Sequence, residues 1–471
     1  MKKACALIIC GLFLWGCSKP KYTVLIREAE NAYYKTRDPY AASKALITHV
    51  NNENEDQLLF MMEAGMLLHA AEQFDSSNKI LLLADKKADN MAKSISGEAA
   101  SYFTNERGKP YRGEDYERVL VNMILGINFM KQGKYDSAMV EFKKVTYKLN
   151  AIKKKTGRKY KMNLMAKYLA AVAATAADEL EFAYVELKQI ERIKPGIPII
   201  ARRLMQTALL LGYNDDYKTY RAKYRRYAPK NAVVRAASEH SDLVMIYQAG
   251  KAPIKVSRGR LLDEKGMRVT LHAAIRVAIL SQNATGVTIA TAMALLATAQ
   301  HPIPKYKRRR SSVNRALLKV TDEAGKEYKV SSALLNNVED TMVKNFEDQY
   351  ASMRSKMVKR IAIKVVATIV AQQVAERTAK KLKAGGGVAA LIGFAAGAAV
   401  GVATFSAEKP DLRCWHTLPA SFQAGQLILK PGKYNATLSY YQGSSVVEEK
   451  DLGEITVKEK QPTIVLARST D

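Results

Sequence analysis

The sequence predicts an α+β protein in which an N-terminal α-solenoid precedes a mixed segment, a long helix and a small β domain. Apolar residues recur at helical spacing through residues 22–237, a region rich in Ala, Leu, Lys and Glu. Residues 238–330 mix strand-like apolar runs with runs that suit helix or strand, and residues 331–405 return to a helical pattern. Residues 411–471 hold short β-branched runs separated by glycine turns, which predicts a C-terminal β domain.

The start of the chain has the layout of a secretory signal peptide. Two lysines precede an apolar stretch from Ala4 to Trp15, and Gly16 and Cys17 follow. The stretch is too short for a stable membrane anchor, because a spanning helix needs about 20 apolar residues. We therefore expect residues 1–16 to be removed on export.

The run from Leu14 to Cys17 resembles the bacterial lipobox, although Trp15 is bulkier than the small residue usual there. The resemblance implies that Cys17 is acylated at the start of a short lipidated N-terminus, residues 17–21. Ser18 at the next position implies sorting to the outer membrane, facing the periplasm. Several acyl chains, at about 0.8 kcal/mol per buried CH₂, make such an attachment effectively permanent.

The chain is strongly basic, with a formal net charge of +29. Basic residues cluster at 153–155, 202–203, 218–230 and 305–310. In a cytosolic protein such clusters would suggest nucleic acid, but export leaves phospholipid headgroups, lipopolysaccharide phosphates and acidic cell-wall polymers as the available anions. We expect membrane contact through the lipid anchor, an anionic lipid or cell-wall polymer as a further partner, and no nucleic acid. A solvated basic surface without a ligand is the alternative.

The sequence predicts no catalytic, cofactor-binding or metal-binding residues, and hence no enzyme. It has no nucleophile elbow, phosphate-binding glycine loop, HExxH helix or paired-cysteine spacing, and its six histidines stand singly. After processing, Cys414 is the one remaining thiol, so the mature chain can form no intramolecular disulfide. We interpret Cys414, beside Trp415, as a packed core residue.

A helix-turn-helix pattern recurs in the N-terminal half. Its clearest copy runs from Leu125–Phe129 through Gly133–Ala138, and the small residues Gly126 and Ala138 would let two antiparallel helices approach closely. The pattern closely resembles a tetratricopeptide (TPR) repeat, with irregular spacing that implies inserts such as residues 105–117. Three or more such units can bury a continuous core, and a plain helical bundle is the alternative. The resemblance implies a periplasmic or envelope protein partner in the concave groove of the repeats.

Residues 385–405 form an apolar segment without charge, in which Gly393, Gly397 and Gly401 recur at every fourth position. This glycine-zipper spacing lets another helix come near. The segment is open to two interpretations: a membrane-inserting or self-associating helix, or a buried hairpin helix packed on the preceding long helix. Alanine and glycine dominate it, so composition favours the buried hairpin.

Three local patterns accompany the repeats: Gly250–Lys255 after a strand, a Lys/Arg/Ala-rich helix at 354–379, and Asp411–Pro419. From Tyr22 to the end, the chain resembles a family of uncharacterised bacterial lipoproteins with TPR-like repeats. Some members are encoded near lipoproteins that activate cell-wall synthases, which implies a role in envelope biogenesis but no reaction. We therefore predict a membrane-anchored, non-enzymatic interaction scaffold. The alternative is an oligomeric membrane-associated or pore component assembled through the glycine-zipper helix.

Overall fold

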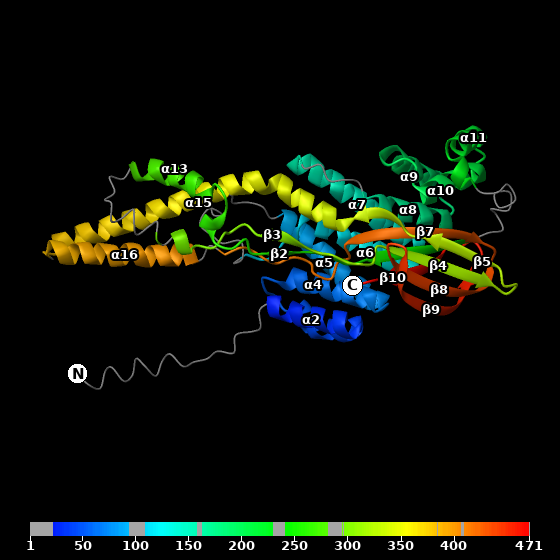
Figure 1. The fold of residues 1–471 in the computed structure, drawn as a ribbon, viewed down its shortest axis with the longest axis horizontal. Helices are drawn as coiled ribbons and strands as arrows, with labels where there is room; N and C mark the ends of the chain where they lie inside the picture. The colour runs from blue at the N-terminus through cyan, green and yellow to red at the C-terminus, as the bar shows by residue number, and fades with distance from the viewer. Residues whose placement is uncertain are drawn as a thin grey trace.

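The computed structural model describes residues 22–93, 109–157, 163–228, 241–280, 294, 296–383, 385–406 and 409–470. The predicted signal peptide and the predicted lipidation site, Cys17, lie outside these residues and stay predictions. Figure 1 shows an elongated molecule in which a body of helices and sheets carries a long helical hairpin at one end.

The N-terminal helices form TPR-like repeats. Each helix packs on the next, and the first helices of successive pairs (α4, α6 and α8) also contact one another. These first helices are almost entirely buried and line what we call the inner face of the repeats. The pairs are α2 (Tyr22–Thr36) with α3 (Pro39–Val50), α4 (Gln57–Ala70) with α5 (Phe74–Lys93), α6 (Asp115–Lys131) with α7 (Tyr135–Thr156), α8 (Leu164–Ala176) with α9 (Leu180–Ile193), and α10 (Pro198–Leu210) with α11 (Asn214–Lys223), followed by a 3₁₀ turn, η4 (Arg225–Tyr227).

Glycine sets the closest approach within two of these pairs. A Cβ on Gly126 would run into the ring of Phe142, and a Cβ on Gly65 would run into Leu81 in the preceding pair. Gly126 is a small residue that the repeat pattern singles out, and its nearest side-chain neighbour follows Ala138 on α7. The Phe142 ring, one helical turn further along α7, fills the space above the glycine, while Ala138 is buried beside it.

There are two four-stranded sheets, in the orders β10-β1-β7-β6 and β5-β4-β8-β9, and β2 pairs with β3. The first sheet packs on the repeats, and the second packs on the other face of β1. β1 runs parallel to β10 and antiparallel to β7, and β4 pairs with β8. The strands are β1 (Ser241–Ala249), β2 (Lys251–Val256), β3 (Lys305–Arg309), β4 (Arg315–Asp322), β5 (Glu327–Ser331), β6 (Ala333–Asn337), β7 (Ser421–Leu429), β8 (Gly432–Gln442), β9 (Ser445–Val457) and β10 (Thr463–Arg468).

The sequence suggested that residues 411–471 form a separate β domain. Their strands instead share both sheets with strands of residues 241–337. The reason lies in β1, which is apolar on both faces. Val244 and Ile246 pack in the core of the repeats, whereas Met245 packs in the core of the second sheet. A strand buried on both faces lies inside a sheet, and its neighbours β7 and β10 come from the C-terminal segment.

The hairpin consists of α15 (Val338–Lys381) and α16 (Gly386–Ser406), with η6 (Leu261–Asp263) and α13 (Met267–Leu280) packed near its base. The sequence predicts one helix from residue 331, but residues 333–337 form the edge strand β6 instead. Asn337 ends that strand and caps α15, because its side-chain oxygen accepts a hydrogen bond from the backbone N–H of Asp340 at 2.9 Å. Of the two runs left open between helix and strand, 273–280 is helical and 287–296 lies largely outside the described residues.

Candidate functional site

The inner face of the repeats is occupied by the chain itself. Along the chain, α16 and β7 are joined by a stretch that includes residues Asp411–Leu418, which we call the inner-face segment. Its Trp415 is fully buried in the core formed by the repeat helices and β1. The guanidinium of Arg413 binds Asp411 at 2.7 Å and Asp56, the residue before α4, at 3.0 Å. This corrects the predicted place of a partner, because the chain's own segment fills the groove on the repeats.

Two carboxylates from successive repeats hold the backbone of this segment. Glu63 on α4 accepts the N–H of His416 at 2.6 Å and the N–H of Thr417 at 3.1 Å. Glu117 on α6 accepts the N–H of Trp415 at 2.6 Å. Three consecutive amides thus donate to buried carboxyl oxygens inside the core, an arrangement suited to holding an extended peptide.

Burial changes the acidity of both carboxyls. It raises the pKa of Glu117 to about 7, with the charge of Glu114 adding to the effect, and it also raises the pKa of Glu63. The hydroxyl of Tyr22 donates to Glu63 at 2.8 Å, and that of Tyr111 donates to Glu117 at 2.5 Å. The contact between repeats and segment therefore titrates nearer to neutral pH than ordinary glutamates do.

Neither glutamate was among the predicted site residues, although one carried a signal in the sequence. Glu63 is the one charged residue in the apolar run Leu58–Leu68, and a charge inside a helix that is buried all round needs a partner in the core. Glu117 carried less of a signal, because it also completes a capping box with Glu114 at the start of α6.

Cys414, His416 and Glu30 form the nearest approach to a catalytic arrangement in the described part of the chain. The His416 ring contacts Glu30 Oε2 at 3.0 Å, and Arg309 pairs with the same carboxylate at 2.5 Å. Burial opposes the charged imidazolium, but Cys414 and Glu30 together hold the pKa of His416 well above its usual value. Cys414 itself is fully buried, in line with the predicted packed core residue.

His69 is a structural histidine, as the sequence suggests for each of the six. Its ring nitrogens contact Asn128 Oδ1 at 2.5 Å and Gln248 Nε2 at 2.7 Å, so it joins α4, α6 and β1. Burial lowers its pKa to about 4, which keeps the ring neutral. Among the described residues, no group of three or more His, Cys, Asp or Glu side chains could hold a metal ion.

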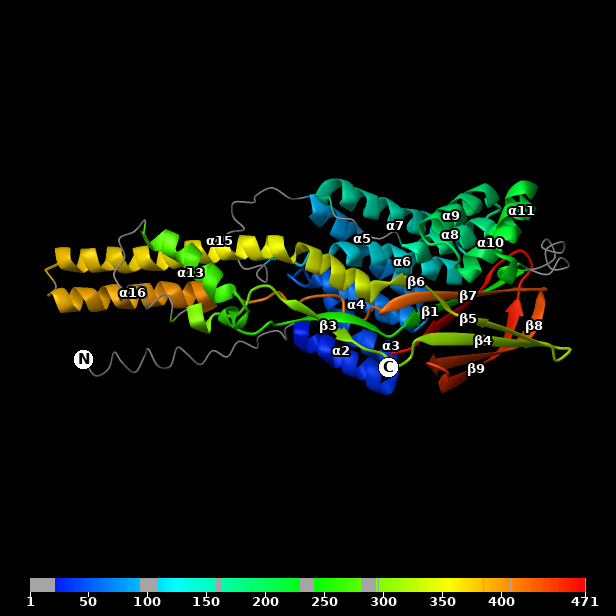
Figure 2. The ribbon, with the colours of Figure 1, turned by 45° about the horizontal axis from the view of Figure 1, so that its top comes forward.

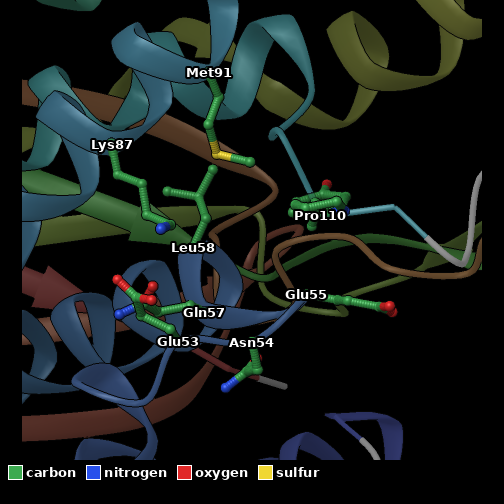
Figure 3. A pocket seen from close by; sticks show the side chains of 9 residues that line it. Glu53, Asn54, Glu55, Gln57, Leu58, Lys87, Met91 and Pro110 are labelled. Atoms are coloured by element: carbon green, nitrogen blue, oxygen red, sulfur yellow. The ribbon is translucent and has the colours of Figure 1, made fainter. Parts of the chain in front are cut away.

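A pocket of about 260 Å³ opens at the start of α4, beside α5 and the chain leading into α6. Figure 3 shows Leu58 and Met91 close together on one wall, with Lys87 pointing toward Glu53 and Gln57. The polar groups do not converge on one point, and the pocket is smaller than the roughly 300–1,000 Å³ typical of small-molecule sites. We therefore assign no ligand to this pocket.

The basic clusters are partly used inside the molecule. In the cluster at 305–310, Arg309 pairs with Glu30, and Arg308 pairs with Glu339 and Asp340 at the start of α15. In the described part of the cluster at 218–230, Lys218 pairs with Asp215 and Lys223 pairs with Glu191. The side chains of Arg221, Arg225 and Arg226 are exposed. The prediction that these basic side chains contact an anionic partner therefore fits residues 218–228 better than residues 305–310.

The glycine-zipper face of α16 packs on α15 of the same chain. A Cβ on Gly393 would lie 2.9 Å from the carbonyl oxygen of Gln372, and a Cβ on Gly397 would lie 2.9 Å from Gln372 Cβ. The close helix approach that the glycine spacing predicts therefore occurs within one chain. Assembly of several chains through these glycines would first have to separate α15 from α16.

The other faces of the hairpin are apolar and exposed, although composition favoured a buried helix. The stretch Gly386–Ala403 is long and apolar enough to cross a membrane, and only 22 % of it is buried. Large apolar side chains exposed on the hairpin are Ile363, Val370, Val374, Leu382, Val388, Leu391, Ile392, Phe394 and Val402. Contiguous apolar surface of this kind marks an interaction site or a membrane contact.

Comparison with known proteins adds little to this geometry. No family model and no curated relative matches the sequence. Solved structures that resemble part of the chain include MamA, residue 41 to the end, from Desulfovibrio magneticus RS-1, with 13% identity, a TM-score of 0.30, and coverage of 44% of this chain and 92% of that one. Another is a putative kinesin light chain of Podosopora anserina with nearly identical TPR-like repeats, with 17% identity, a TM-score of 0.32, and coverage of 44% and 97%. At these TM-scores the likeness carries no conclusion, and the repeat architecture rests on the helix packing above.

Proposed function

We propose that this chain is a non-enzymatic protein-interaction scaffold of the bacterial cell envelope, anchored to the outer membrane through acyl chains on Cys17. The observation that carries the proposal is that the repeat helices and the first sheet pack into one body. The inner face of the repeats shares one continuous core with β1, β6 and β7, and the buried polar groups there serve the chain's own packing. Such a body suits the presentation of surfaces to other proteins. A role in envelope biogenesis rests on the family resemblance.

The partner binds the outer face of the repeats, because the inner face is filled. The second helices α5, α7 and α9 form this face and each presents large apolar side chains to solvent. Val140 and Tyr147, seven residues apart on α7, share one side of the helix, as do Val185 and Ile193 on α9. Tyr147 is 73% exposed, and tyrosine is among the residues most enriched at protein interfaces.

In-cell photocrosslinking tests this placement with the full chain. A photoreactive residue replacing Tyr147 should form a discrete adduct with an envelope protein. One replacing Val446, which is 49% exposed on β9, serves as the control and should form none. The Val140→Asp substitution, at an exposed position, should remove the Tyr147 adduct without lowering the melting temperature. Equal adducts from both positions, or an adduct that survives Val140→Asp, would contradict an outer-face site.

The anchor has its own test. Cys17→Ala should leave a precursor that takes up no labelled palmitate, whereas Cys414→Ala should label as the wild type does. Normal labelling of Cys17→Ala would remove the anchor from the proposal and leave the scaffold standing.

A further inference from the structure

The α15–α16 hairpin projects away from the body. Figure 2 shows the outer parts of both helices lying side by side at one end of the molecule, clear of the repeats and the sheets. Its base is held by a separate core cluster that joins Phe405 to Leu261 and Met267 and extends along α15 as far as Ile369. Beyond that base, α16 packs along α15, so the outer faces of both helices point outward.

The dimensions of α16 match those of a bilayer. Its 21 residues rise about 31 Å, against a hydrocarbon thickness of about 30 Å. None of these residues is charged. On α15 the uncharged stretch is shorter, because residues 365–375, between Lys364 and Glu376, rise about 17 Å. The hairpin topology removes an objection to insertion of a single helix, because both ends of a hairpin return to the same side and the sheets need not cross.

The charged residues at the tip of the hairpin indicate which kind of surface it contacts. Arg377, Lys380, Lys381 and Lys383 stand against one acid, Glu376, which pairs with Lys380 at 2.7 Å. Long basic side chains at the end of an apolar helix can place their amines among phosphate groups while their stems stay in the apolar layer. A second copy packed tip to tip would bring these like charges together.

The first described helix, α2, begins on the matching side. Figures 1 and 2 show that α2 begins on the side of the body from which the hairpin projects. Cys17 stands five residues before Tyr22, so an acylated Cys17 would hold this side within about 17 Å of a membrane surface.

We propose that the α15–α16 hairpin spans a lipid bilayer, with Lys381 and Lys383 among the phosphates of anionic lipids on the far side. The hairpin is then a second membrane attachment, formed by one chain. This inference deepens the envelope location proposed above, but its test does not depend on the partner protein or on acylation.

The test reconstitutes the full chain into vesicles of phosphatidylethanolamine and phosphatidylglycerol. Leu391→Cys, at a position 68% exposed, carries an environment-sensitive fluorophore, and Tyr147→Cys carries it on the body. We expect blue-shifted emission and quenching by lipids brominated deep in the acyl chains at Leu391, and neither at Tyr147. A cysteine replacing Leu382 at the tip should resist an impermeant maleimide until detergent is added, while the Tyr147 cysteine on outward-facing molecules reacts at once.

Charge-reversal variants check the role of the tip. Lys381→Glu with Lys383→Glu should lower the ratio of inserted to uninserted chain by about fivefold for each lysine lost. Lys79→Glu with Lys86→Glu, at exposed positions on α5, makes the same change in charge and should leave the ratio unchanged.

Three results would overturn the proposal. A Leu391 probe that stays in water while the chain remains on the vesicles would leave the lipid anchor standing and remove the spanning hairpin. A tip cysteine that reacts without detergent on outward-facing molecules would show that the hairpin does not cross. Blue-shifted emission that needs no lipid and grows with protein concentration would assign the apolar face to a second copy of the chain.

Discussion

Helices α8 and α16 are similar in composition and opposite in environment. Both are rich in alanine and apolar residues, yet α8 is buried along nearly its whole length and α16 is mostly exposed. α8 is enclosed by α6, α7 and α9 and by the strands β6 and β7, whereas α16 packs along α15. The charge inside α8, Lys167, has a buried partner, Glu186, at 2.8 Å. An apolar helix is therefore a core element in the body and an interaction surface in the hairpin, and its neighbours rather than its composition decide which.

Removing a carboxylate from the inner face should have the largest effect on the body. Glu63→Ala leaves the amides of His416 and Thr417 and the hydroxyl of Thr417 buried without the acceptor that Glu63 provides. We expect a loss of roughly 3–5 kcal/mol in the free energy of unfolding, measured by urea denaturation. Glu63→Gln keeps an acceptor oxygen and should lose less. Equal losses for both variants would show that the hydrogen bonds to the segment are not what matters.

Truncating α8 should cost nearly as much. Leu169 is fully buried at the centre of this helix, and Leu169→Ala leaves a cavity that close packing on every side keeps open. We expect about 2–5 kcal/mol of destabilisation, with a lower melting temperature for the repeats and sheets together because they share one core. If the sheets melted at the wild-type temperature, the shared core would be wrong.

The next effect in size is a pH dependence carried by Glu117. Its pKa is about 7 in the folded chain and near 4.5 when unfolded, so the folded state binds the proton more tightly. Stability from this group is therefore fully present below pH 4.5 and is lost as the pH rises through 7, by about 1–3 kcal/mol. The difference in unfolding free energy between wild type and Glu117→Gln should fall by this amount from pH 4.5 to pH 7. A difference that rises with pH would contradict the burial of a protonated carboxyl.

How far the sequence predicts this molecule depends on the range of the interactions. The helix pairs follow from local periodicity, and Gly126 signals the close approach within one pair, where the Phe142 ring fills the space beside it. The sheets depend on pairings between distant segments, such as Leu243 with Thr463, that no local pattern specifies. The inner-face segment is similar: its residues stand out in the sequence, but Glu63 becomes part of a site only when α4 meets the segment.

The smallest expected effect is the sharpest test of the comparison. Leu391 on α16 is 68% exposed, so Leu391→Ala removes side-chain atoms that contact little of the rest of the protein. In detergent-free solution we expect a change within about 0.5 kcal/mol in the free energy of unfolding, as for surface substitutions generally. The matched change Leu169→Ala alters the same atoms in the same kind of helix, so the contrast isolates the surroundings of the two leucines. Amide hydrogen exchange should agree, with protection in α16 unchanged in Leu391→Ala. A loss above about 2 kcal/mol for Leu391→Ala would mean that the exposed face of the hairpin is covered in solution. The difference between body and hairpin would then disappear.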